Sequence, residues 1–414
     1  MTIIQKIFSN VAGRKVETGE FIWAQLSLVA MRDFGGPNVI QEYENCFADR
    51  SVFEPSKVAI TFDLHIPARN EKVATNQKIL RDFARRQGVR LFDVNTGVGQ
   101  HILLESGLVK PGDIIVGTDS HMNLLGAVGA AGFGMGTTDI AGAMYKGKLW
   151  FRVPETMKIT LNGSFGECVG AKDAILRIVK EVGTSGALNR AIEFGGEAID
   201  RMNLAERITI ASMVTEMSGD IGFITPNNEV IDFIKSRTNE KLISLEPDRD
   251  AVYERTCEYT VEDLGPQIAC PHSPDNVKDV SEVVGTKVDQ VFIGSCTNGR
   301  IEDLEIAAQF LKGRKVKRGL RLIVVPATME TARASVQRGL HEIFLASGAV
   351  VTNPGCALCT TGHPGILAPD EVMVSTSNRN FMGKLGKGAH VYLASPATAA
   401  ATALTGEITD PRSI

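Results

Sequence analysis

The C-terminal third of the chain alternates short β-rich runs with longer helical patterns, and this alternation restricts the folds that the chain can adopt. Residues 288–295 (VDQVFIGS) and 321–325 have the composition of buried strands. Amphipathic runs follow each of them, at 301–312 and 329–347, and predict two helices. Strands that alternate with helices form a mostly parallel sheet with helices on both faces. The pattern therefore predicts an α/β fold.

The same pattern continues to the end of the chain. Residues 371–375 and 390–394 predict two further strands. A closing helix is well bounded, with Ser395 as N-cap, Pro396 at the first helical position and Gly406 as C-cap. This last domain therefore ends on a helix.

The first 150 residues show the same alternation and indicate a separate domain. Strand-like runs at 58–64 and 113–119 enclose a helical pattern at 76–88. A new strand and helix pattern opens after Pro154. We place domain boundaries near residues 155 and 284, which divides the chain into domains 1–155, 156–283 and 284–414.

Composition excludes several classes of protein. Of the 414 residues, 43% are hydrophobic and 22% charged, which excludes a disordered chain and a coiled coil. The net charge is −4 and basic residues form no run, so we expect neither nucleic acid nor a membrane as partner. The apolar stretch at 123–136 is too short and too rich in glycine to span a membrane. The N-terminus does not resemble a signal peptide and seven cysteines is an odd count, so we expect a cytoplasmic protein.

Three of the seven cysteines lie in loops that could meet at one site. Cys296, in GSCTNGR, follows a predicted strand at its carboxyl end, where open α/β sheets bind ligands. Cys356 and Cys359 form a C-x-x-C in NPGCALCTTG, among turn-forming residues. We expect the other four to be small buried residues: Cys46, Cys168, Cys257 and Cys270.

The chemistry of these three cysteines has more than one explanation. A C-x-x-C can be a redox pair, half of a zinc site or a chance match. Structural zinc needs four ligands, and the sequence has no second C-x-x-C and no H-x-x-x-H nearby. Three thiolates suit an iron–sulfur cluster with one iron left open, which could polarise a substrate hydroxyl. Purely structural cysteines remain the alternative.

Long motifs along nearly the whole chain resemble the aconitase family of iron–sulfur hydro-lyases. The likeness is greatest to the large subunits of its two-subunit members, the 3-isopropylmalate dehydratase and homoaconitase type. The motifs, in the family's order, are KPGDIIVGTDSH (110–121), FGMGTTDIAGAMYKGKLWFRVPET (133–156), ACPHSPDNV (269–277), GSCTNGR (294–300), NPGCALC (353–359) and STSNRNFMGKLG (375–386). The resemblance implies that Cys296, Cys356 and Cys359 hold a [4Fe–4S] cluster.

The resemblance also implies a fold and a partner. Family members have three α/β/α domains with mostly parallel sheets around the cluster, and a fourth, mobile domain. In short members that domain is a separate small subunit, which supplies a serine as catalytic base. This chain ends at Ile414, just after the predicted closing helix. The resemblance therefore implies a small-subunit partner.

Several further residues match family positions for catalysis or substrate binding. Asp119 and His121 would belong to the supporting network of acids and hydrogen bonds. Glu216 would join them, and Ser212, which stands where asparagine is usual, would share its helical face through the i, i+4 spacing. Arg379 matches an arginine that binds a substrate carboxylate, which suits the fork of a guanidinium group.

Other positions depart from the family pattern. The usual Asp-His pair is here Asp63-Leu64-His65, and on an extended segment this shift would turn the histidine to the opposite face. The remaining departures are Arg32-Asp33 for His-Asp, Gln100-His101 for His-Gln, Met122 for threonine and Lys384 for a second arginine. The cluster cysteines are intact whereas substrate-facing positions have changed, and Asp63 and Lys384 stay predicted substrate-binding residues. We therefore expect an altered substrate rather than a lost cofactor.

These observations predict a hydro-lyase acting on a small 2-hydroxy di- or tricarboxylate. 3-Isopropylmalate is the default substrate, and 2,3-dimethylmalate or the homoaconitase substrate is the alternative. The altered positions favour an alkyl-substituted malate over citrate, because a desolvated extra carboxylate needs its own charged partner. A non-enzymatic, cluster-sensing or RNA-binding relative is the rival of another class, and the net negative charge weighs against it.

Overall fold

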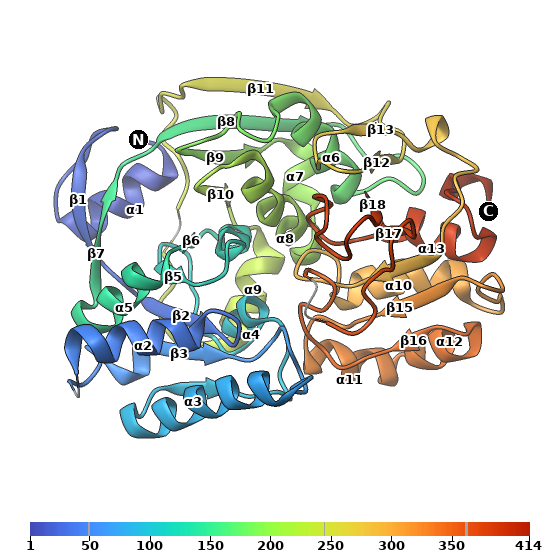
Figure 1. Ribbon diagram of the computed structural model, residues 1–414. Helices are drawn as coiled ribbons and strands as arrows, with labels where there is room; N and C mark the ends of the chain where they lie inside the picture. The colour runs from blue at the N-terminus through green and yellow to red at the C-terminus, as the bar shows by residue number, and fades with distance from the viewer. Residues whose placement is uncertain (49, 244, 361–362) are drawn as a thin grey trace. The chain divides into compact units, whose positions relative to one another are not determined.

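The computed structural model describes residues 1–48, 50–243, 245–360 and 363–414 (Figure 1). The chain forms two compact units. The first comprises residues 1–94, 99–162 and 187–259, and the second comprises residues 95–98, 163–186 and 260–414. The sheets in both are mostly parallel and alternate with helices along the chain, which confirms the predicted α/β class. The division into three domains stays a prediction.

The first unit contains a five-stranded sheet in which every pair of neighbours is parallel. The strands, in spatial order, are β4 (Arg90–Phe92), β3 (Val58–Thr61), β2 (Leu28–Arg32), β5 (Ile114–Gly117) and β6 (Ala131–Gly134). The accompanying helices are α1 (Ile3–Ala12), α2 (Gly36–Phe47), η1 (Pro55–Lys57), α3 (Glu71–Gln87), α4 (Gly99–Glu105), η2 (Met122–Val128) and α5 (Thr137–Lys146). β3 and β5 are buried along their whole length, as expected for a sheet covered on both faces.

A second sheet in this unit has the order β10 (Ile221–Ile224), β9 (Arg190–Gly195), β8 (Glu155–Asn162) and β11 (Arg255–Thr260). Its helices are α7 (Glu197–Arg201), α8 (Leu204–Ser212), η3 (Met213–Met217) and α9 (Asn228–Arg237). Strands β1 (Phe21–Gln25) and β7 (Lys148–Arg152) pair as an antiparallel ribbon. In the core, the rings of Phe8, Phe133 and Phe151 pack on one another at centroid distances of 4.9–6.4 Å.

The second unit is built on a seven-stranded sheet. Its order is β13 (Val277–Asp279), β12 (Gln267–Ala269), β18 (His390–Ala394), β17 (Val372–Ser375), β14 (Gln290–Ile293), β15 (Arg321–Val324) and β16 (Val350–Val351). The pairs that include β12 are antiparallel and the others parallel. The helices are α6 (Ala171–Val182), η4 (Val280–Glu282), α10 (Ile301–Leu311), α11 (Met329–Gln337), α12 (Leu340–Ser347), α13 (Pro396–Thr405) and η5 (Pro411–Ser413). Leu304 and Leu311 of α10 share the core with Ala399, Ala400 and Ala403 of α13.

The predicted elements of this unit are confirmed with one correction. α13 begins after Ser395, whose hydroxyl accepts a hydrogen bond from Thr398 N, and ends at Gly406 in the left-handed conformation. The single helix predicted over 329–347 is wrong, because the structure has α11 and α12 there. Gly339, at φ 74°, breaks the run between them, since that conformation cannot continue a right-handed helix. Among the described residues, every helix is too short or too polar to cross a membrane.

Candidate functional site

Three charged side chains stand at the carboxyl ends of neighbouring parallel strands in the first unit. Arg32 is the last residue of β2, Asp63 follows β3 by two residues, and Asp119 follows β5 by two residues. β2 lies between β3 and β5 in the sheet. The strand order therefore places the arginine between the two aspartates, at the edge where open α/β sheets bind ligands.

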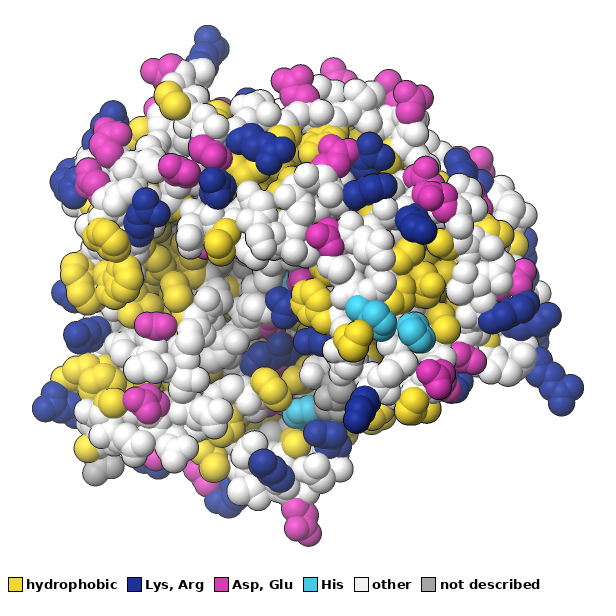
Figure 2. All heavy atoms as spheres, turned by 45° about the horizontal axis from the view of Figure 1, so that its top comes forward, with side chains coloured by type: hydrophobic (Ala, Val, Ile, Leu, Met, Phe, Trp, Pro, Cys, Tyr) yellow, Lys and Arg dark blue, Asp and Glu magenta, His cyan; other side chains and the backbone are white. Residues whose placement is uncertain are grey.

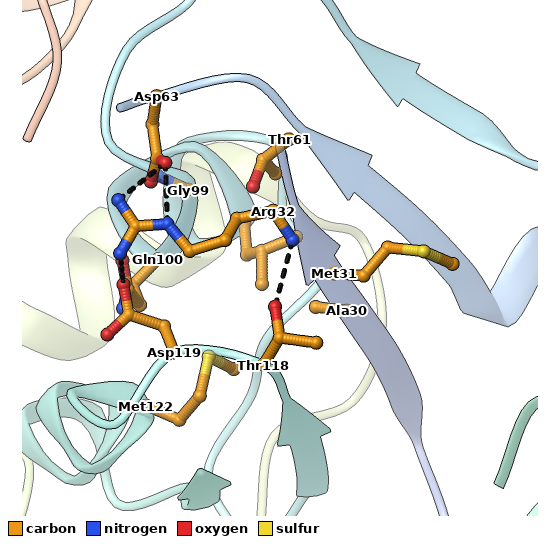
Figure 3. Close-up of a pocket in the computed structure, with 11 residues that line it drawn as sticks. Ala30, Met31, Arg32, Thr61, Asp63, Gly99, Gln100, Thr118, Asp119 and Met122 are labelled. Atoms are coloured by element: carbon orange, nitrogen blue, oxygen red, sulfur yellow. Dashed lines mark hydrogen bonds and ion pairs between the residues drawn. The ribbon is translucent and has the colours of Figure 1, made fainter. Parts of the chain in front are cut away.

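The Arg32 guanidinium bridges the two carboxylates (Figure 3). Its Nε donates to Oδ1 of Asp63 at 2.8 Å, its Nη2 forms an ion pair with the same oxygen at 2.7 Å, and its Nη1 donates to Oδ2 of Asp119. Oδ2 of Asp63 accepts from Gly99 N at 2.9 Å. Both oxygens of Asp63, a predicted substrate contact, are thus engaged within the protein. Its role toward substrate stays a prediction.

The two aspartates respond to this environment in opposite ways. Burial raises the pKa of Asp63, and the opposing charge of Arg32 does not offset it. Burial also acts on Asp119, but Arg32 and the contacts with His121 outweigh it and hold the pKa of Asp119 well below its usual range. Asp119 is therefore ionised at neutral pH, and Asp63 is the partner that takes up a proton first.

Asp33 fixes the turn that carries Asp63. Its carboxylate accepts hydrogen bonds from the backbone amides of Asp63, Leu64 and His65 at 3.3, 3.2 and 3.0 Å. The segment after β3 is therefore a bend and not an extended strand. The expectation that one shifted place turns His65 to the opposite face of an extended segment is wrong, because a bend has no period of two. His65 is buried beside the ring of Phe34.

The three predicted catalytic residues come together. His121 Nε2 lies 2.9 Å from Glu216 Oε1, and His121 Nδ1 lies 3.6 Å from Asp119 Oδ1. The same Asp119 oxygen accepts from His121 N at 2.9 Å. All three side chains are buried. An imidazole within hydrogen-bonding reach of a carboxylate can hold or pass a proton, which suits acid–base chemistry.

Glu216 and Ser212 do not share the face of one α-helix, which corrects the sequence prediction. α8 ends at Ser212, and Glu216 lies in the 3₁₀ helix η3. A 3₁₀ helix has about 3.0 residues per turn, so an i, i+4 pair is no longer aligned across this junction. Ser212 is fully buried at the end of α8. Its contact with substrate stays a prediction.

A small cavity adjoins the Arg32 bridge. Its volume is about 10 Å³, roughly the room that one water molecule needs. Thr61, Gln100 and Met122 are among the residues that line it (Figure 3). Gln100 is 2% exposed, and neither its Nε2 nor its Oε1 has a hydrogen-bond partner in the described part of the chain. Buried polar groups without a partner are rare in folded proteins, so this amide is an unusual feature of the cavity wall.

The three predicted cluster cysteines gather in the second unit. Cys296 follows β14, and Cys356 and Cys359 follow β16. The sulfurs of Cys356 and Cys359 are 3.0 Å apart, and Cys296 is within hydrogen-bonding reach of Cys359. Cys296 and Cys356 are 1% and 3% exposed. The C-x-x-C and the distant Cys296 thus face the same spot.

Tight turns bring these cysteines together. Ser295 and Ala357 take positive φ values of 83° and 51°, which side chains other than glycine rarely adopt. Ser295 Oγ lies 3.4 Å from Cys359 Sγ and 3.7 Å from Cys296 Sγ. Such strained positions cluster at functional sites, where the surrounding fold maintains them.

The donor set fits an iron–sulfur cluster in chemical type. A hydrogen bond with Cys296 favours the Cys359 thiolate, but the contact with Cys356 and burial prevail and raise the pKa of Cys359. Buried thiols of this kind ionise readily only when a metal supplies positive charge. Among the described residues, no set of three or more His, Cys, Asp or Glu side chains stands in an arrangement that could hold a metal ion. The three cysteines therefore fit a cluster by the type of their donor atoms, whereas their side chains do not have a coordinating geometry in this structure.

The loop after β17 lies against Cys296. Asn378 Oδ1 accepts from Thr297 Oγ1 at 3.0 Å and lies 3.6 Å from Cys296 Sγ. Lys172 of α6, which is 2% exposed, donates to the carbonyl oxygens of Thr376 and Ser377, each at 2.9 Å. The loop is thus held from two sides directly before Arg379.

The two predicted carboxylate-binding cations belong to this same loop and its continuation. Arg379 follows Asn378 and is half-buried. Lys384 is also half-buried, and its backbone amide donates to Phe381 O at 3.0 Å. The sheet that carries the cysteines thus also carries both cations, and their roles toward substrate stay predictions.

The remaining cysteines only partly match the expectation that they are buried. Cys270 is buried, whereas Cys168 and Cys257 are partly exposed. The expectation is wrong for Cys46, which is exposed on α2 with its sulfur 3.4 Å from Glu42 Oε1. The solvent-facing side of an amphipathic helix accepts a cysteine as it accepts other small residues.

A second hollow in the first unit has a volume of about 500 Å³. It is lined by residues of β6, α5, β7 and the turn after η3, including Asp139, Trp150 and Asp220. Burial alone raises the pKa of Asp220 to about 6.

The surface of the chain has both apolar and charged side chains. The β1–β7 ribbon exposes Phe21 and Trp23. Acidic and basic side chains are interspersed on the face drawn in Figure 2.

Comparison with known proteins identifies the family. Residues 5–287 and 281–406 match the aconitase family (aconitate hydratase). The chain belongs to the aconitase family.

Several relatives are similar over nearly the whole chain. The chain is 44% identical to the 3-isopropylmalate dehydratase large subunit 1 of Methanopyrus kandleri, over 99% of each chain. It is 43% identical to the 3-isopropylmalate dehydratase large subunit 1 of Archaeoglobus fulgidus, over 100% of this chain and 99% of that protein. A probable methanogen homoaconitase large subunit of Methanosarcina mazei is 46% identical over 88% of this chain and 93% of its own.

A solved structure supports the fold. The holo form of Thermococcus kodakaraensis aconitase X superimposes with a TM-score of 0.52 at 13% sequence identity, covering 91% of this chain and 89% of that one. At this identity the likeness concerns the fold alone. It agrees with the α/β architecture of both units.

Sequence reasoning missed two residues of these sites. Arg32 stood out only as a departure from a pattern, because the sequence does not show that β2 lies between β3 and β5. Lys172 gave no signal, since a single lysine in an amphipathic helix usually faces solvent. An unusual arginine at the end of a buried strand is the one signal that could have identified Arg32.

Proposed function

We propose that this chain is the catalytic large subunit of a [4Fe–4S]-dependent hydro-lyase for a small 2-hydroxy di- or tricarboxylate, with 3-isopropylmalate as the default substrate. The observation that carries the proposal is the gathering of the buried Cys296 and Cys356 and the partly exposed Cys359 at one place, in a chain of the aconitase family. The 3-isopropylmalate dehydratase large subunits, similar over almost the entire chain, support the choice of substrate.

The three cysteines would hold the cluster. When bound, the cluster would supply a Lewis-acidic iron that makes the substrate hydroxyl a better leaving group. Asn378, beside Cys296, would orient the first of these ligands.

His121 and Glu216 would handle the proton that accompanies the departing or incoming water. Their 2.9 Å contact allows one proton to be held between Nε2 and Oε1. Asp119 would keep the imidazole ring oriented through its Oδ1. Ser212 and Asp63 would also help to bind the substrate.

Arg379 and Lys384 would bind substrate carboxylates. A guanidinium offers two parallel donors to one carboxylate, whereas an ammonium offers a point charge. The site would therefore have one guanidinium, that of Arg379, and not two. This suits a substrate with an alkyl group in place of a third carboxylate. The homoaconitase relative of Methanosarcina mazei makes homocitrate-type substrates the alternative outcome.

A separate small subunit would complete the enzyme. Relatives that match this chain over nearly their full length are themselves named large subunits. We propose that the partner brings the catalytic base, and that the complex works in the cytoplasm.

The test has two parts. Anaerobically prepared protein should contain a [4Fe–4S] cluster, and Cys→Ser substitution at 296, 356 or 359 should remove iron and the absorption near ~400 nm that is typical of such clusters. Cys46→Ser, at an exposed cysteine outside the site, is the matched control and should retain both. A full cluster in any of the three site variants contradicts the assignment.

Turnover is then measured for the complex with a small subunit on a panel of 2-hydroxy acids. We expect kcat/KM for an alkyl-substituted malate at least ~30-fold above that for citrate, because an unpartnered desolvated carboxylate costs on the order of 2 kcal/mol. Equal turnover of citrate contradicts the substrate choice, and preferential turnover of homocitrate assigns the chain to the alternative.

A further inference from the structure

We propose that Arg32 is a positioning residue, which holds the Asp119 carboxylate in place and through it orients the His121 imidazole toward Glu216. This inference rests on the proposed function, because it assigns Arg32 a part in that reaction.

The contacts of Asp119 are divided between its two oxygens. Oδ2 accepts from Arg32 Nη1, while Oδ1 accepts from His121 N at 2.9 Å and lies 3.6 Å from His121 Nδ1. A carboxylate held at both oxygens cannot rotate. Its direction fixes the imidazole ring, whose opposite nitrogen meets Glu216 at 2.9 Å.

The charges around Arg32 show why its loss would change the contact between Asp119 and His121. Arg32 is the cation of a buried group that includes the carboxylates of Asp33, Asp63 and Asp119. Without it, three carboxylates would share the end of one sheet, and like charges this close cannot all stay ionised. The buried titratable groups of the elements packed here are Asp33, Asp63, His65, His101, Asp119, His121 and Glu216.

Arg32 acts through Asp119 and not on the substrate. Its side chain is 13% exposed, and its Nε, Nη1 and Nη2 all point to protein carboxylates. Its backbone amide is also fixed, by Thr118 Oγ1 at 3.0 Å. A planar fork can serve Asp63 and Asp119 on two sides at once, as Figure 3 shows, which a lysine ammonium does less well.

The first experiment follows Asp119 directly and does not depend on activity. The isolated chain is labelled with ¹³C at the aspartate carboxyl carbons, and the Asp119 signal is assigned by its loss in Asp119→Asn. In the wild type we expect this signal to remain that of a carboxylate from about pH 8 to about pH 5. In Arg32→Gln its midpoint should move up by at least about one pH unit, since an adjacent opposite charge lowers a carboxyl pKa by about 1 to 3 units.

Arg190→Gln is the matched control. Arg190 also contacts two carboxylates, Glu254 at 3.0 Å and Glu155 at 3.9 Å, but it lies at the start of β9 away from the Asp119 group. Its substitution should leave the Asp119 titration unchanged. Arg32→Lys keeps the charge but loses the planar fork, so it should raise the Asp119 midpoint less than Arg32→Gln does, and it gives a second measurement if Arg32→Gln folds poorly.

The second experiment measures kcat and KM against pH in the complex with its small subunit and cluster. Arg32→Gln should lower kcat about 10- to 100-fold, the usual effect of removing a residue that orients a catalytic group. KM should change less than about 2-fold. The acidic limb of the kcat profile should move to higher pH, and Arg190→Gln should reproduce the wild type.

An unchanged Asp119 titration in Arg32→Gln overturns the inference. An increase in KM with constant kcat also overturns it, because Arg32 would then contact substrate. If the wild-type complex turns over no hydroxy acid, the proposed function fails, while the NMR experiment still decides whether Arg32 holds Asp119 ionised.

Discussion

At the scale of single residues, the carboxylate of Asp33 supplies hydrogen-bond acceptors that a neighbouring strand would otherwise supply. Asp33 accepts three consecutive backbone amides, those of Asp63, Leu64 and His65, and is itself 3% exposed. Without it, these three donors would lie buried with no strand to pair with. Asp33 therefore sets the bend on which Asp63 approaches Arg32.

This arrangement predicts a strong effect for Asp33→Ala. Loss of the carboxylate should lower the free energy of unfolding by about 2 to 4 kcal/mol, because each buried unsatisfied amide costs about 1 to 3 kcal/mol and solvent satisfies some of them. Asp33→Asn keeps one acceptor oxygen and should cost less. Urea unfolding measures both, and a loss below about 0.5 kcal/mol for Asp33→Ala would show that the bend does not need Asp33.

The sequence predicted some individual site residues and missed others. The cysteines could be identified because C-x-x-C and the flanking glycines and asparagines form long local motifs. Arg32 and Lys172 could not, because their partners lie 31, 87, 204 and 205 residues away and depend on strand order. A long-range ion pair has no local sequence signature.

At the scale of elements, local patterns predicted most strands and helices of the second unit. The predicted strand at 390–394 has the same bounds as β18, and α13 has the predicted caps. The errors arose where a backbone conformation changes within an apolar pattern. Gly339 splits one predicted helix in two, and α8 passes into a 3₁₀ helix before Glu216. Hydrophobic spacing alone does not reveal such changes.

Close packing of η2 against β10 gives a prediction at this scale. A Cβ at Gly126 of η2 would lie 1.6 Å from Gly222 O, a backbone atom of β10. Gly126→Ala should therefore push the helix that follows His121 off its sheet and lower stability by about 1 to 3 kcal/mol. Thermal unfolding of the variant measures this loss.

Gly142→Ala is the matched control for this substitution. A Cβ at Gly142 of α5 meets nothing within 4 Å, and the residue lies inside a helix. Alanine should raise stability there by up to about 1 kcal/mol, because it has the higher helix propensity. Equal shifts in melting temperature for the two variants would show that η2 yields to the added methyl group.

At the scale of the whole molecule, the chain contains several carboxyl groups for which burial outweighs the nearby positive charges and hydrogen bonds. Asp173 of α6 is fully buried, and its oxygens accept from Gln267 N at 2.8 Å and Gly170 N at 3.0 Å. These hydrogen bonds favour the ionised form, but burial prevails and raises the pKa of Asp173 to about 7. Burial raises the pKa of Asp303 to about 7 in the same way.

Such groups make stability fall as pH rises. Between the unfolded pKa of about 3.9 and the folded value of about 7, the folded chain binds a proton that the unfolded chain has released. The unfolded state therefore gains relative stability with increasing pH, by at most about 1.4 kcal/mol per pH unit for each group. We expect the free energy of unfolding in urea to decrease from about pH 5 to about pH 7, and less steeply in Asp173→Asn, which has no proton to release.

Asp82→Asn is the matched control. It removes an exposed carboxyl whose pKa is lowered by Lys78, so this carboxyl titrates below the range from about pH 5 to about pH 7. The Asp82→Asn variant should therefore retain the wild-type slope. Parallel slopes for the wild type and Asp173→Asn would mean that Asp173 is ionised in the folded chain throughout this range.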